Sequence, residues 1–362
     1  MIGLRAALVF SLIGGLSGMA TQCTPKRPPP VVVQTPPAPI KAGPEIRVTA
    51  TPVPLDASNP AHVTVEGGFT YAGGLALTST DTSRLHGLSD LAIGADGQLT
   101  SISDEGDIFE ARLQLDASGR LVGLTDGKLW PLKGLDGQPI QGGKAQTDAE
   151  GLAVLANGDH LISFERNHRI WLYPLQPDGG WGTPRAVPKP ATVFPDNEGM
   201  EAITAYPAAG PDAYLVGGEE GEVWLCHLAG DCKALPPQSG PDFTWGLTGF
   251  APFSGGAIAT LHRGYDPIRG WRSIVRFISD PTKPAALQRI TAALHLEGAL
   301  VRDNFEGVAL TRSPAGGTRL YLISDDQAAG NNQRTLLLAF DWVAPPLPPP
   351  MPPKPVKRRG RH

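Results

Sequence analysis

One short motif recurs five times along this chain, and it limits the folds that the chain can adopt. Each copy contains a short apolar strand, a turn with glycine, a second strand that ends in polar residues, and a third strand. The copies begin at Leu88, Ala149, Met200, Leu247 and Phe305, roughly 50 to 60 residues apart. A repeat of this length, with strand-forming residues and glycine turns, is typical of a β-propeller, in which each repeat forms one blade of antiparallel strands.

We therefore predict an all-β fold, a β-propeller with six blades. The segment from Ile46 to Ser79 has strand-like residues but no clear copy of the motif. We expect it to supply the sixth blade, with strands shared between the N- and C-terminal parts to close the ring. A pair of β-sandwiches is the main alternative, but it does not explain the repeated motif. No long segment has the 3.6-residue periodicity of a helix, which argues against an α/β fold.

The N-terminal residues 1–20 have the features of a signal peptide, because their apolar run is too short to span a bilayer. The alternative is a lipoprotein signal that ends at residue 22, which would leave Cys23 lipidated and anchor the protein to a membrane. Both interpretations predict export, to the periplasm, to the outer membrane as an anchored lipoprotein, or out of the cell.

Residues 23–44 and 344–362 are rich in proline, and the second segment is also basic. We predict that both are extended, disordered linkers, which leaves residues 45–343 as the folded domain. Within this domain, Cys226 and Cys232 flank a short turn-like segment. We expect them to form a hairpin-closing disulfide in the oxidising environment that export provides, with two free thiols as the alternative.

The charge of the folded domain favours cations as ligands and argues against nucleic acid. All 35 acidic residues lie within residues 43–345, whereas nine of the 31 basic residues lie outside this segment. The segment therefore has 22 basic residues and a formal net charge of −13. A surface this acidic repels the phosphate backbone of DNA or RNA.

Acidic residues also recur at one position of the predicted blades. The first strand of a propeller blade lines the central channel, and the second strand runs back beside it. The start of the first strand and the end of the second strand therefore lie at the same mouth of the channel. The residues predicted at this mouth are Asp90, Asp104, Asp148, Glu150, Glu165, Arg166, Glu201, Glu219, Glu220, His262, Arg263, Glu306, Asp325 and Asp326. Ionised carboxylates this close repel one another, and a hard divalent cation such as Ca²⁺ would stabilise them. The alternative is that each carboxylate only caps a strand or bonds to the backbone of a neighbouring blade.

With these residues in view, the chain resembles the phytase-like propeller family, whose members are described as having "esterase-like activity of phytase". The matching segments are "LSDLAIGADGQLTSISDEGDI", "TDAEGLAV" with "SFERNHRIWLY", "DNEGMEAIT" and "NFEGVALTRSPAGGTRLYLISDD", spread over residues from about 70 to 342. The resemblance implies a propeller fold and hydrolysis of phosphoesters or esters. The Asp-rich "DAADDPAIW" signature of calcium-dependent propeller phytases is absent, so phytate is not the expected substrate.

The sequence contains no nucleophile elbow, P-loop, HExxH motif or dinucleotide fingerprint, which leaves metal-assisted hydrolysis of a small anionic or ester substrate as the simplest mechanism. We predict four cation ligands, three candidate general bases, one general acid and three substrate-binding residues. The cation ligands are Asp90, Glu150, Glu201 and Glu306; the bases are Asp104, Glu165 and Asp325; the acid is His262; and the substrate-binding residues are Arg166, Asn167 and Arg263. For His262, a structural hydrogen bond is the alternative. A non-catalytic cell-envelope scaffold with a structural calcium and a lactonase-like hydrolase remain open. The sequence predicts no oligomeric state.

Overall fold

The computed structural model describes residues 44–327 and 333–344. The predicted signal segment, Cys23 and nearly all of the two proline-rich ends lie outside the described residues. Among the described residues, no helix is both long and apolar enough to cross a membrane.

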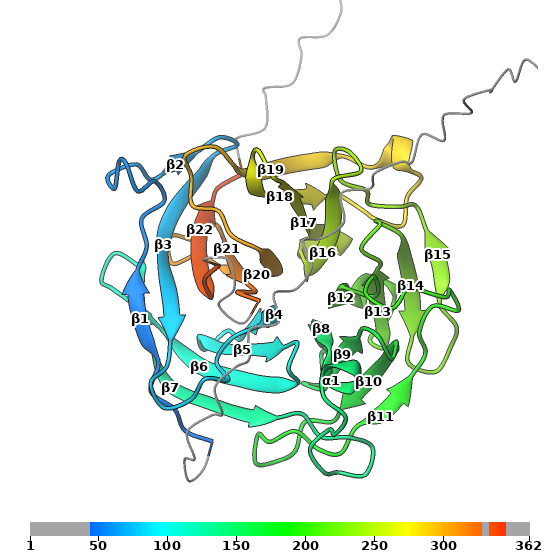
Figure 1. Ribbon diagram of the computed structural model, residues 1–362. Coiled ribbons are helices and arrows are strands. Elements are labelled where there is room, and N and C mark those ends of the chain that lie inside the picture. The colour runs from blue at the N-terminus through cyan, green and yellow to red at the C-terminus, as the bar shows by residue number, and fades with distance from the viewer. Residues whose placement is uncertain (1–43, 328–332, 345–362) are drawn as a thin grey trace, which may run out of the picture.

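The described residues form five β-sheets arranged in a ring, which is the architecture of a β-propeller (Figure 1). Four of the sheets, here blades 1 to 4, are each built from four strands that are consecutive in the chain. Blade 1 contains β4 (Leu88–Ile93), β5 (Gln98–Ser103), β6 (Asp107–Leu115) and β7 (Leu121–Pro131). Blade 2 contains β8 (Ala149–Val154), β9 (His160–Phe164), β10 (Arg169–Tyr173) and β11 (Arg185–Val187). Blade 3 contains β12 (Ala202–Ala205), β13 (Ala213–Gly217), β14 (Val223–His227) and β15 (Lys233–Leu235). Blade 4 contains β16 (Trp245–Pro252), β17 (Ile258–Asp266), β18 (Gly270–Ile278) and β19 (Ile290–Leu296).

Blade 5 joins the two ends of the folded domain. It contains β20 (Phe305–Arg312), β21 (Thr318–Ser324) and β22 (Leu336–Trp342), followed by β3 (Phe69–Thr78) and β1 (Thr49–Pro52), while β2 (Thr64–Val65) pairs with β3. The prediction of six blades is therefore wrong, because the N-terminal strands complete the fifth sheet instead of forming another. The physical reason is the antiparallel ladder between β3 and β22, which places Leu75 opposite Leu337.

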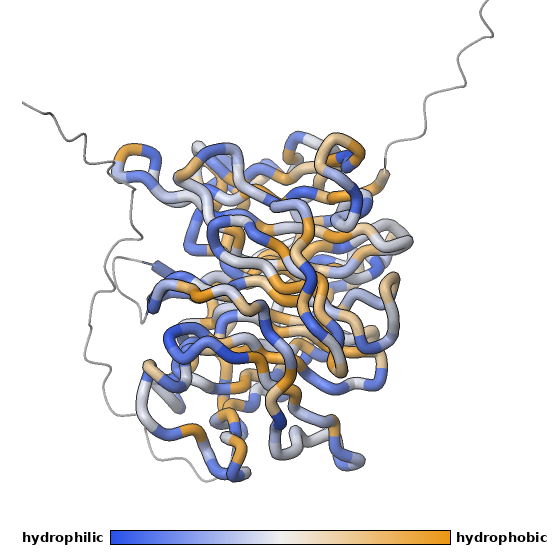
Figure 2. The backbone as a smooth tube through the Cα atoms, turned by 90° about the vertical axis from the view of Figure 1, so that its right-hand side faces the viewer, coloured by the Kyte–Doolittle hydropathy of each residue, from blue (hydrophilic) through white to orange (hydrophobic). Residues whose placement is uncertain are grey.

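The first strand of each blade lines the channel. β4, β8, β12, β16 and β20 contact one another in this circular order around the axis (Figure 1). The hydrophobic core lies between neighbouring sheets; for example, Leu99 and Phe109 of blade 1 pack with Leu337 of blade 5. The side view in Figure 2 shows hydrophilic and hydrophobic residues alternating along the chain.

Helical structure among the described residues is limited to single turns. They are α1 (Lys144–Thr147), η1 (Pro207–Ala209), η2 (Ser254–Gly256) and η3 (Ala285–Leu287). Cys226 in β14 and Cys232 form a disulfide across the turn that follows this strand. Only α1 lies at the end of the channel where the predicted site residues gather.

Candidate functional site

A β-bulge near the start of the inner strands sets the direction of the acidic side chains. The pairing register of β8 with β9 shifts between Ala149 and Gly151, and that of β20 with β21 shifts between Phe305 and Gly307. The extra residue at each bulge is a glutamate, Glu150 or Glu306, and a bulge leaves such a residue outside the ladder and redirects its side chain.

The glycine after each bulge is required by close contact between neighbouring inner strands. A Cβ atom on Gly151 would lie 2.8 Å from the Glu201 carbonyl oxygen, and one on Gly307 would lie 2.7 Å from the Asp90 Cα atom. Real Cβ atoms are essentially never this close to other atoms. The recurring Glu-Gly pair of the sequence motif thus combines a redirected carboxylate with a glycine that lets the strands approach.

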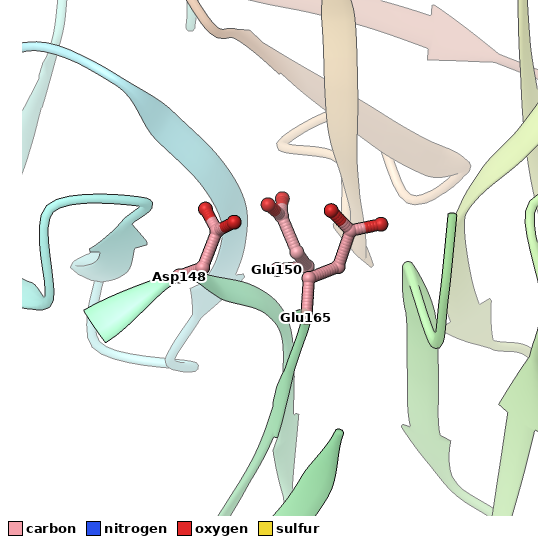
Figure 3. A group of neighbouring side chains, drawn as sticks. All are labelled: Asp148, Glu150 and Glu165. Carbon is pink, nitrogen blue, oxygen red and sulfur yellow. The ribbon is translucent and has the colours of Figure 1, made fainter. Parts of the chain in front are cut away.

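Three buried carboxylates meet at the end of the β8–β9 hairpin. Asp148, Glu150 and Glu165 each offer a carboxylate oxygen, and these oxygens all lie within 4.8 Å of one another. The Glu165 backbone N–H donates to the Asp148 carbonyl oxygen at 2.8 Å, which fixes the two ends of the hairpin together. Figure 3 shows the three side chains extending to the same side of the chain. We call this set the carboxylate cluster.

Electrostatic repulsion is concentrated on Glu150. Burial raises the pKa of its carboxyl well above the usual value, and the neighbouring carboxylates of Asp148, Glu201, Glu165 and Glu306 raise it further. A divalent cation with oxygen ligands would remove this repulsion, since carboxylate oxygens are its preferred ligands in proteins. The donor set is composed of oxygen atoms alone, so it fits Ca²⁺ or another hard cation.

Two cationic side chains contact the carboxylate cluster. The Lys144 ammonium in α1 contacts the Asp104 carboxylate and lies 3.3 Å from Asp148 Oδ1. Burial lowers the pKa of Lys144, but the neighbouring carboxylates outweigh it and raise this pKa above its usual value. Arg166 donates from Nε to Asp148 Oδ2 at 2.6 Å and from Nη2 to Asn197 Oδ1 at 2.7 Å.

A second polar group joins blades 3, 4 and 5. Arg263 contacts Glu306 and donates to Glu219 Oε1 at 2.9 Å and to Asn304 Oδ1 at 3.0 Å. The Asn304 amide donates in turn to Glu306 Oε1 at 3.0 Å and to Asp325 Oδ2 at 3.1 Å. Arg263, predicted to bind substrate, is therefore buried and held by protein carboxylates, and Glu306 and Asp325 belong to this group.

Asp90 lies away from the carboxylate cluster, although we expected it among the cation ligands. The bulge in β4 falls at Ser89, so Asp90 corresponds to Gly151 of β8 and not to Glu150. Its carboxylate accepts the backbone N–H groups of Leu91 and Leu152, each at 2.8 Å. The bond from Leu152 fastens blade 1 to blade 2.

His262 also lies apart from the cluster. Its Nε2 is 2.7 Å from the Gln238 carbonyl oxygen, and burial lowers the pKa of the ring to about 4. A neutral, buried imidazole that donates to a backbone carbonyl suits a structural role better than that of a general acid. Asn167 is exposed, and its side chain donates to Gln146 Oε1 at 2.8 Å.

Of the remaining predicted mouth residues, Asp104 is buried, at 9% exposure. Asp326 accepts hydrogen bonds from the Gly87 backbone N–H and the Thr335 hydroxyl, both at 3.0 Å. Glu220 is exposed. Sequence reasoning missed Lys144, Asn197 and Asn304. Only Lys144 had a signal, since it stands four residues before Asp148, a spacing that brings opposite charges together on one helical turn.

Five blades around a channel, with buried carboxylates at one mouth, define a β-propeller with an acidic channel site. The chain belongs to the phytase-like family described as "Esterase-like activity of phytase", whose model matches residues 83–328. This confirms the resemblance found in the sequence. A comparison with curated proteins gave no match.

Three solved structures have some likeness to this chain. The holo PQQ domain of pyranose dehydrogenase from Coprinopsis cinerea has 11% identity and a TM-score of 0.41, covering 77% of this chain and 97% of that one. A putative gluconolactonase has 12% identity and a TM-score of 0.43, covering 81% and 92%. The β-propeller domain of Cps50 (Swd1) from Myceliophteria thermophila has 12% identity and a TM-score of 0.38, covering 85% and 100%. At sequence identities and TM-scores this low, none of the three structures indicates what this chain does.

Proposed function

We propose that this chain is an exported hydrolase of small phosphoester or ester substrates that depends on a divalent cation, with Ca²⁺ the expected ion. The observation that supports this is the carboxylate cluster, whose three oxygens within 4.8 Å repel one another when ionised, although Lys144 and Arg166 offset part of the charge at Asp148. Membership of the phytase-like family adds the expectation of ester chemistry.

In this proposal, Asp148, Glu150 and Glu165 hold the cation, and Glu201 supports them from blade 3. When bound, such an ion polarises the oxygen of the scissile group and lowers the pKa of a coordinated water. This modifies the ligand set expected from sequence. Asp148 and Glu165 join Glu150 and Glu201, whereas Asp90 and Glu306 already have bonds to other parts of the protein.

The substrate would be oriented by the groups beside the cluster. The Arg166 side chain is 30% exposed and uses Nε and Nη2 for protein contacts, which leaves its other terminal nitrogen for an anionic substrate. Asp104 is the proposed base, because its Oδ1 accepts no hydrogen bond from the described residues while its Oδ2 contacts the Lys144 ammonium. It can therefore take a proton from an attacking water.

The second candidate is a non-catalytic scaffold in which the cation only joins the blades. The burial of all three cluster residues favours it, since a structural ion is enclosed by protein ligands. The two candidates predict the same cation binding but opposite results for turnover.

The experiment is a turnover assay on the full chain after treatment with EDTA. The substrates are p-nitrophenyl phosphate, bis(p-nitrophenyl) phosphate and p-nitrophenyl acetate, each with and without added Ca²⁺ or Mg²⁺. We expect turnover that requires the cation and is lost in Glu150→Gln but kept in Glu222→Gln, which removes an exposed carboxylate from blade 3. Cation binding without turnover would favour the scaffold, and turnover that ignores both the cation and Glu150→Gln would refute the proposal.

A further inference from the structure

The three most exposed large hydrophobic side chains of the described residues all lie at the carboxylate end of the channel. Ile268 is 96% exposed, Val193 is 92% exposed and Phe243 is 78% exposed. Single exposed hydrophobic residues are common on proteins, but the three extremes on one face need an explanation. They lie in the β17–β18 turn, the β11–β12 loop and the β15–β16 loop, respectively.

Contacts along these segments place them around the channel mouth. Phe194, the neighbour of Val193, has its ring centroid 5.4 Å from that of His168, which follows the cluster residue Glu165 by three positions. Thr244, the neighbour of Phe243, accepts a hydrogen bond from Arg272 of β18 at 3.1 Å. The β15–β16 loop therefore adjoins the hairpin that carries Ile268.

The β17–β18 hairpin also extends beyond the other hairpins at this end. β9 ends at Phe164 and β21 ends at Ser324, each opposite the residue just before the bulge. The equivalent residue of β17 is His262, but β17 continues to Asp266 and remains paired with β18 throughout. Ile268 thus lies at the tip of a regular hairpin that stands above the mouth.

Basic side chains flank this tip. The Arg269 side chain is 59% exposed and its Nε donates to Asp266 at 2.6 Å. Arg302 is exposed and donates from Nη1 to the Arg269 carbonyl oxygen at 2.6 Å. Guanidinium groups beside an exposed apolar residue match a surface that has phosphate groups above an apolar layer.

We propose that the channel mouth docks on a phospholipid surface, with Val193, Phe243 and Ile268 inserted among the headgroups and Arg269 and Arg302 beside lipid phosphates. The substrate of the mouth would then be an ester or phosphoester of an amphiphilic molecule in the lipid layer. This substrate class rests on the proposed hydrolase function, whereas the docking itself does not.

The test is flotation of the full chain with vesicles, in a Cys23→Ser background so that no lipid anchor contributes. The vesicles are phosphatidylcholine alone and phosphatidylcholine with phosphatidylglycerol. We expect the chain to float with both, because the exposed apolar side chains can insert among the headgroups of either vesicle. Phe243→Ser/Ile268→Ser should lower the partition coefficient about tenfold, because two large apolar side chains are lost from the bound state.

The matched control is Leu287→Ser/Val343→Ser, which removes two side chains that are 66% and 65% exposed at the opposite end of the blades. It should bind vesicles like the parent chain. No flotation, or equal losses in the two double variants, would overturn the docking. Flotation is also measured in EDTA and with the Glu150→Gln variant, because docking is expected to require neither a bound cation nor turnover. Docking that persists under these conditions, together with no hydrolysis of ester or phosphoester lipids by the parent chain in the presence of Ca²⁺, would refute the substrate class and the hydrolase, but not the surface.

Discussion

At the scale of single residues, Lys144 is the side chain that most directly competes with a cation. Its ammonium contacts Asp104 and lies 3.3 Å from Asp148, so it neutralises charge that a divalent ion would otherwise neutralise. The pair is partly exposed to water, which limits its strength. Lys144 is thus an internal counterion of the carboxylate cluster.

Replacing Lys144 with Met should strengthen Ca²⁺ binding about fivefold, because Asp148 would lose a competing cation. Isothermal titration calorimetry of the two proteins measures the change. Lys144→Arg keeps the positive charge and serves as the control, with an affinity close to that of the parent chain. Weaker binding in Lys144→Met would show that the lysine supports the cation and does not compete with it.

His160 makes the stability of the fold depend on pH. Its ring is 8% exposed and stacks on Trp181 with 3.9 Å between ring centroids. Burial lowers the pKa of the ring from 6.5 to about 4. The unfolded chain therefore binds more protons than the folded chain between these values, and the free energy of unfolding falls as pH decreases from 6.5 to about 4.

The contribution of His160 over this interval is about 3 kcal/mol. We expect His160→Gln to be less stable at pH 7 through the loss of stacking, but to show a smaller decrease in unfolding free energy between pH 7 and pH 4. Urea unfolding at several pH values measures the slope. An unchanged slope would mean that His160 does not titrate across this range.

At the scale of the structural element, the β-bulge explains both what the sequence predicted and what it missed. The Glu-Gly pair identified Glu150 and Glu306 as residues of the channel mouth, and the equivalent position in "MEAIT" identified Glu201, since the motif marks the start of the inner strands. The motif misplaced Asp90, because matching "SDLA" to "EGLA" by their acidic residues places Asp90 at the position of Glu150. The bulge register instead aligns Ser89 with Glu150. Asp148 was expected at the mouth but not among the cation ligands, and Lys144 was not expected there, because neither residue recurs in the other repeats.

Gly151→Ala tests the requirement for glycine after the bulge. The added Cβ would lie 2.8 Å from the Glu201 carbonyl oxygen, so we expect a loss of about 1 to 3 kcal/mol in unfolding free energy. Gly230→Ala is the control, because a Cβ there would lie no closer than 3.4 Å to another atom. Urea unfolding compares the two variants. Equal stabilities would contradict the role assigned to the glycine.

At the scale of the whole molecule, the closure of the ring by β1 and β3 was only partly predictable. Sharing of strands between the two ends was expected from the short N-terminal segment. The number of blades was not, because a segment without the motif can either form its own sheet or complete another. Pairing of β3 with β22 decides this, and it depends on contacts between residues far apart in the sequence.

Removal of residues 44–78 should prevent folding of the rest of the chain, because β22 would be left as an unpaired edge and the core around Leu75 would be open. Circular dichroism and size-exclusion chromatography of the shortened chain measure this. Addition of a peptide of residues 44–78 should restore a compact, folded species. A shortened chain that folds alone would show that closure by these strands is dispensable.

The central claim is that Asp148, Glu150 and Glu165 form a divalent cation site. Its most direct test is calorimetric titration of the EDTA-treated full chain with Ca²⁺, alongside Glu150→Gln and the exposed-carboxylate control Glu222→Gln. We predict saturable binding in the parent chain and in Glu222→Gln, and loss of binding in Glu150→Gln with the fold intact by circular dichroism. Absence of binding in the parent chain, or equal binding in Glu150→Gln, would contradict the assignment.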